Sequence, residues 1–82
     1  MRTLAPVPTK ENVLALLKQA LADHQMFEYR MTERTRKHMA VDIQSVNMIV
    51  KVAEALKPEN KEKFLALAPN VGRMALVAWR VA

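Results

Sequence analysis

The prediction of the fold starts from residues 9–38, TKENVLALLKQALADHQMFEYRMTERTRKH. Within this stretch, side chains spaced alternately by four and three positions form one narrow stripe: Val13, Leu17, Ala20, His24, Phe27 and Met31. That spacing places them along one side of a helix, as in two helices that pack lengthwise. No Gly or Pro interrupts the chain between Pro8 and Pro58. We therefore expect a long first helix over residues 10–36, with a break near His24 and Gln25 as the alternative.

Three further helices are expected downstream. Asp42 is the best candidate N-cap of a second helix, and Pro58 suits the first position of a third helix, which Pro69 stops. Asn70 can cap a last helix over residues 71–81. The chain has a single Gly, whereas all-β domains need many tight turns that use Gly. We expect an all-α fold, a small helical bundle in which the long N-terminal helix packs antiparallel on the second helix and two short C-terminal helices close one end.

The chain has 82 residues, which is enough for one domain. We expect an extended N-terminal arm over residues 1–8, where Pro6 and Pro8 lack amide donors, followed by a single helical domain over residues 9–82. The start of the chain has no apolar run of signal-peptide length, and the stretch 74–79 is too short to span a bilayer. The absence of cysteine excludes disulfides and thiolate metal sites. These features predict a cytoplasmic protein with no membrane association.

No arrangement of residues typical of an active site is present. The sequence lacks a Gly-rich phosphate loop, a nucleophile elbow and a metal-binding His pair. On one straight helix, His24 and His38 would lie about 21 Å apart at ~1.5 Å per residue, which is too far to share a metal ion. Ser45 is the only serine and has no histidine nearby in the sequence. We therefore expect a non-enzymatic protein with no catalytic, cofactor or metal site.

The apolar surface of the expected helices exceeds what one copy could bury. The second helix is apolar over most of its circumference and the last is apolar nearly all round, so each is either central in its fold or shared with a partner. We expect a homodimer with a twofold interface. The residues assigned to self-association are Phe27, Met31, Met48, Val52, Met74, Val77 and Trp79. The first prediction of function is a small regulatory or adaptor protein that acts through helix-mediated protein–protein binding and self-association.

The alternative prediction is a nucleic-acid-binding regulatory module, with DNA as the candidate ligand. The net charge is +5, and four of the nine residues in 30–38 are Lys or Arg. On a helix, this segment would present a basic ridge able to contact phosphates or an acidic protein face. A solvated helix end is the competing interpretation, because cations there complement the helix dipole. The candidate contact residues are Arg30, Arg34, Arg36, Lys37 and His38.

Overall fold

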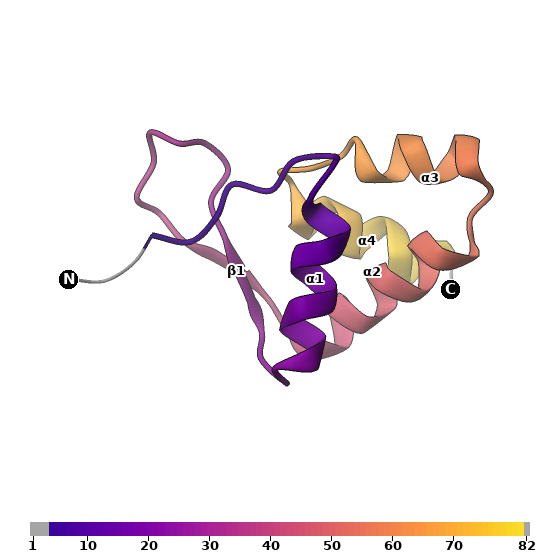
Figure 1. The fold of residues 1–82 in the computed structure, drawn as a ribbon, viewed down its shortest axis with the longest axis horizontal. Helices are drawn as coiled ribbons and strands as arrows, with labels where there is room; N and C mark the ends of the chain where they lie inside the picture. Colours follow the sequence, from indigo (N-terminus) through magenta and orange to yellow (C-terminus); the bar gives the residue numbers. More distant parts are fainter. Residues whose placement is uncertain (1–3, 82) are drawn as a thin grey trace.

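The computed structural model describes residues 4–81. Its elements in chain order are α1 (Val13–Ala22), β1 (Phe27–Tyr29), β2 (Met39–Val41), α2 (Ile43–Ala55), α3 (Pro58–Leu65) and α4 (Val71–Val81). The two strands pair antiparallel, with Phe27 opposite Val41 and Tyr29 opposite Met39. The hairpin lies at one side of the helices and α3 at the other (Figure 1). The all-α prediction is therefore wrong, since the fold is helix-rich but includes a small antiparallel sheet.

The first helix, expected over residues 10–36, is short because the chain leaves the helix at His24. This residue adopts a positive φ of 54°. The backbone N–H groups of His24 and Gln25 donate to the carbonyls of Leu21 and Ala20. This is the Schellman arrangement that ends many helices. The break considered as the alternative is thus the correct one, and no long antiparallel helix pair forms within the described chain.

Residues 27–41 form a hairpin because aromatic and polar side chains alternate in β1. Phe27 and Tyr29 are buried in the core, at 5% and 1% exposure, while Glu28 between them is half-buried. The two rings stack with their centroids 6.0 Å apart. Large aromatic side chains at every second position suit a half-buried strand. The Tyr29 hydroxyl also accepts a hydrogen bond of 3.0 Å from the Gly72 N–H, which ties the hairpin to the first turn of α4.

The turn that leads into α1 is closed by a reciprocal pair of hydrogen bonds. The Asn12 N–H donates to Thr9 Oγ1 at 3.2 Å, and the Thr9 N–H donates to Asn12 Oδ1 at 2.7 Å. This pattern is that of a capping box with Asn in place of Glu or Gln. The Thr9 carbonyl also accepts from the N–H of Val13, the first residue of α1. Thr9 therefore caps the turn that begins the first helix.

The last three helices begin where the local signals place them. Asp42 directly precedes α2, Pro58 is the first residue of α3, and the Arg73 N–H in the first turn of α4 donates to Asn70 Oδ1 at 3.1 Å. The helix α2 packs against both α1 and α4. The core between them is made of fully buried side chains, among them Leu17, Ile49 and Met74. This central position accounts for the apolar circumference of α2 within a single chain.

None of the helices in residues 4–81 combines the length and the hydropathy that crossing a membrane requires.

Candidate functional site

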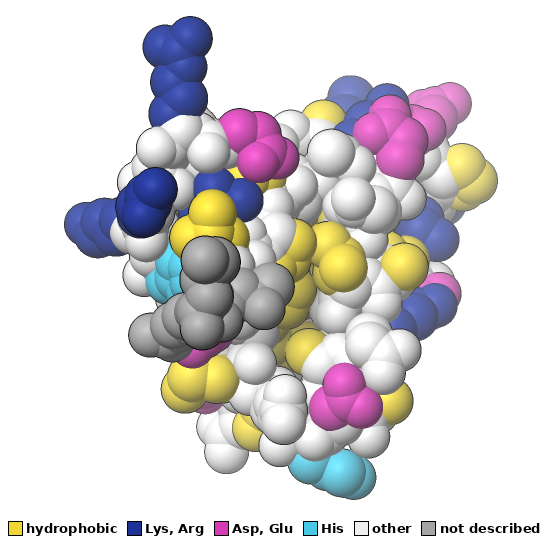
Figure 2. Space-filling model, turned by 60° about the vertical axis from the view of Figure 1, so that its left-hand side comes forward, with side chains coloured by type: hydrophobic (Ala, Val, Ile, Leu, Met, Phe, Trp, Pro, Cys, Tyr) yellow, Lys and Arg dark blue, Asp and Glu magenta, His cyan; other side chains and the backbone are white. Residues whose placement is uncertain are grey.

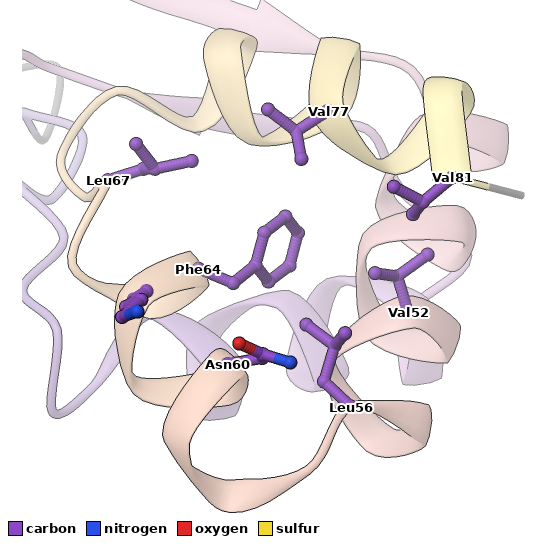
Figure 3. A pocket seen from close by; sticks show the side chains of 8 residues that line it. Val52, Leu56, Asn60, Phe64, Leu67, Val77 and Val81 are labelled. Carbon is purple, nitrogen blue, oxygen red and sulfur yellow. The ribbon is translucent and has the colours of Figure 1, made fainter.

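An open apolar groove lies between α2, α3 and α4. Its volume is about 250 Å³, and its lining consists of Val52, Leu56, Asn60, Lys63, Phe64, Leu67, Val77 and Val81. Phe64 projects from α3 toward Val77 of α4, with Val52 of α2 and Leu56, the residue after α2, on a third side (Figure 3). Among residues 4–81, Lys63 is the only charged residue of this lining. The groove therefore offers hydrocarbon surface with one cation among its walls.

The volume of this groove limits what it can hold. Small-molecule and cofactor sites typically occupy ~300–1,000 Å³ and contain several convergent polar groups. This groove is smaller, and Asn60 and Lys63 supply its only polar side chains. No cluster of three or more His, Asp or Glu side chains in the described part of the chain could hold a metal ion. The groove therefore differs in size and polarity from a typical cofactor site.

The surface of α4 beside the groove is apolar and flanked by arginines. Leu76 and Val81 are 66% and 61% exposed. A shallow hollow of about 70 Å³ is lined by Arg73, Leu76, Val77 and Arg80. Val77 borders both this hollow and the groove. The two depressions are therefore neighbours, and cations from α3 and α4 line them.

The residues assigned to self-association do not gather on one outward face. Those in the core of the single chain are Phe27, Val52 and Met74. Those half-buried against this core are Met31, Met48 and Val77. Only Trp79 is largely exposed, at 49%, and its Nε1 donates to Ser45 Oγ at 3.2 Å. The homodimer stays a prediction.

A loop, and not a helix, carries the basic residues of segment 30–38. Arg30 is only 5% exposed, and its Nη1 donates to the carbonyls of Glu33 and Thr35 at 3.0 Å each. Its Nε donates to the Ala5 carbonyl at 2.6 Å, and its Nη2 lies 3.3 Å from the Glu33 carboxylate. The planar guanidinium can donate to several acceptors at once. Arg30, a candidate partner contact, is therefore engaged in shaping the loop.

The N-terminal arm closes the base of this loop. The Ala5 N–H donates to His38 Nε2 at 3.3 Å, while the Ala5 carbonyl accepts from Arg30. The Arg30 N–H in turn donates to the Pro6 carbonyl at 2.9 Å. The first and last residues of the loop thus hold the same part of the arm. Residues 1–3, the rest of the predicted arm, lie outside the described residues.

The other candidate contacts, Arg34, Arg36 and Lys37, are exposed. Their backbone is fixed by side-chain turns, since the Thr35 N–H donates to Thr32 Oγ1 at 3.2 Å and the Lys37 N–H donates to Thr35 Oγ1 at 3.1 Å. Cationic side chains project from this end of the molecule (Figure 2). None of the ion pairs found among the described residues involves these three side chains.

The groove was missed by sequence reasoning because its lining comes from three helices. Leu56 and Phe64 each look like ordinary core residues in the sequence, and only packing shows the space between them. The roles of Arg30 and His38 were missed for the same reason, since their partner Ala5 is distant along the chain.

No protein-family model matches this chain, and no curated protein or solved structure matches it either.

Proposed function

We propose that this protein is a small, non-enzymatic regulatory or adaptor protein that binds an acidic amphipathic helix of another protein. The binding site is the groove between α2, α3 and α4. The observation that carries the proposal is an open apolar groove bordered by cations and, among residues 4–81, lined by no carboxylate side chain. Helix-in-groove recognition uses this type of surface, with the apolar face of the incoming helix laid into the groove.

The charge around the groove defines the chemistry of the partner. Lys63 lines the groove, and Arg73 and Arg80 line the neighbouring hollow. A helix with apolar side chains at positions i and i+3 or i+4, and with Asp or Glu beside them, fits both features. Solvent-exposed ion pairs contribute only about 0–1 kcal/mol each. The affinity therefore comes from the apolar side chains, while the cations select acidic partners and speed association.

A second copy of this chain is the less favoured occupant of the groove. A twofold contact brings the same patch of both copies together. Lys63, Arg73 and Arg80 would then share one interface with the same three cations of the second copy, and such like-charge contacts are costly. Homodimerisation remains the alternative outcome, recognisable by a sedimentation mass of two chains.

A peptide-display selection against the full chain tests the proposal. Enriched peptides are expected to combine Leu or aromatic side chains at helical spacing with Asp or Glu. Val81→Glu, at the wall of the groove, is expected to weaken binding of a synthesised peptide by at least about tenfold. Met26→Glu is the matched control, because Met26 is 56% exposed against 61% for Val81 and does not line the groove. This control is expected to change the affinity by less than about twofold.

Three results would contradict the proposal. One is enrichment of basic or purely polar peptides, and another is an equal effect of both variants. The third is a free protein that sediments with the mass of two chains and dissociates in the Val81→Glu variant, which would make a second copy the occupant of the groove.

A further inference from the structure

We infer that the tip of the loop over residues 30–38 is a second binding surface, which contacts the phosphates of a nucleic-acid backbone through Arg34, Arg36 and Lys37. This inference does not depend on the groove. The loop projects beside the sheet, and α3 lies on the other side of the molecule (Figure 1). The groove is formed where α2, α3 and α4 meet.

The loop is held in shape by the protein before any ligand arrives. The guanidinium of Arg30 donates to carbonyls within the loop and to the arm, and His38 accepts from the arm at the other end of the loop. Fixing one residue of backbone costs about 1–2 kcal/mol of conformational free energy. Because the loop is already ordered in the folded protein, binding a ligand does not add this entropic cost.

The positive charge at the tip is not neutralised by the loop itself. Glu33 is the only acidic residue in 30–38, and its carboxylate lies against Arg30. By contrast, Lys10 and Lys18 form ion pairs with glutamates of other helices. The three exposed cations therefore remain available to an anionic ligand.

The composition of the tip favours nucleic acid over a protein or a membrane. Residues 32–37 are Thr, Glu, Arg, Thr, Arg and Lys, with no aromatic or large apolar side chain. Protein interfaces and membrane-surface segments both rely on such apolar anchors. A purely electrostatic contact suits a regular row of phosphates instead. Arg34, Arg36 and Lys37 carry three positive charges within four residues, which is enough to contact about three phosphates.

Fluorescence anisotropy with labelled DNA tests the inference. The probes are a mixed-sequence duplex of about 20 base pairs and one of its single strands, titrated with the full chain at several salt concentrations. Contact with three phosphates predicts a log–log salt slope near −2.7 on the duplex. The dissociation constant then rises roughly 40-fold between about 50 and 200 mM salt.

Two triple variants that lose the same charge distinguish binding by the loop from binding by net charge. Arg34→Gln, Arg36→Gln and Lys37→Gln together are expected to flatten the slope by about 2–3 and to weaken binding more than about tenfold at low salt. The control carries the same loss of charge on α2, α3 and the residue before α3, at Lys51, Lys57 and Lys61. It is expected to bind within about threefold of the parent. The groove variant Val81→Glu is expected to bind DNA like the parent.

The inference is overturned if neither probe binds at low salt, or if both triple variants weaken binding equally. It is also overturned if vesicles containing phosphatidylserine bind more tightly than either DNA and lose binding in the loop variant. In that case the tip recognises an anionic lipid surface.

Discussion

Replacement of Arg30 by Met tests whether the loop depends on one buried guanidinium. Met keeps much of the length of the side chain but removes every donor. The carbonyls of Ala5, Glu33 and Thr35 lose the bonds of 2.6, 3.0 and 3.0 Å that they accept from Arg30. We expect the loop and the arm to separate while the helical core stays folded, because no core helix contributes an acceptor to this side chain.

The size of the effect follows from which acceptors water can reach. Carbonyls of the loop regain hydrogen bonds to water when the loop opens, so they contribute little to the loss of stability. Ala5 is only 8% exposed, so its carbonyl can reach water only if the arm leaves the core; a buried acceptor left without a donor would cost about 1–3 kcal/mol. Removal of a buried charge recovers part of its desolvation penalty. Loss of charge-assisted bonds, each worth about 1.5–3 kcal/mol, outweighs that gain. We expect a net destabilisation of about 2–4 kcal/mol, and a midpoint lower by roughly 10–25 °C.

Urea unfolding followed by circular dichroism measures the loss of stability, and amide hydrogen exchange shows which part of the chain opens. Exchange is expected to accelerate at Ala5 and Arg30, whose N–H groups bridge arm and loop. Arg30→Lys retains the charge but lacks the planar fork, so an intermediate loss is expected. Arg34→Met is the matched control, because Arg34 is exposed, and it is expected to stay within about 0.5 kcal/mol of the parent. A stability of Arg30→Met equal to that of this control would refute the reasoning.

Three smaller predictions concern local interactions. Thr9→Ala removes the side-chain acceptor of the Asn12 N–H, leaving only the Thr9 carbonyl, and is expected to cost about 1 kcal/mol in urea unfolding, whereas an unchanged midpoint would rule out the capping role. His24→Gly relieves the positive φ at the end of α1 and is expected to raise stability by about 0.5–1 kcal/mol, and a lower thermal midpoint would contradict this. A hydrogen bond from Lys18 lowers the pKa of Glu54 below its ordinary value of 4.5. The Lys18–Glu54 pair therefore stabilises the fold above pH 4.5, and this stabilisation disappears as the pH falls through the lowered pKa. The midpoints of the parent and Glu54→Gln are thus expected to differ slightly near neutral pH and to converge once the pH falls below the lowered pKa; a constant difference would exclude the pair as the cause.

Much of the helical structure was predictable because its signals are local. Pro58 fixes its own φ and needs no amide donor at the start of α3, and the Asn70 side chain reaches a backbone N–H only three residues later. Such interactions form between neighbours in the chain. The hydrogen bond between the Asn12 N–H and Thr9 Oγ1 at the entrance to α1 is equally local.

The hairpin was not predictable with the same ease, because its strands are three residues long. Phe27 falls at helical spacing from Leu17 and Ala20, so the helical pattern of the sequence extends into a segment that is not a helix. The alternation of Phe27, Glu28 and Tyr29 was the competing signal, and it spans too few residues to outweigh a longer periodic pattern. Pairing with Met39–Val41 decides that residues 27–29 form a strand and not part of a helix.

The sequence by itself determined where three helices begin, that the chain is basic, and which residues carry the charge of segment 30–38. Only the tertiary structure decided what those residues do. Arg30 is buried because carbonyls from the loop and from Ala5 converge on its guanidinium, while Arg34 points to solvent. The groove likewise exists only where α2, α3 and α4 meet. Burial depends on contacts between residues far apart along the chain, and no local pattern contains that information.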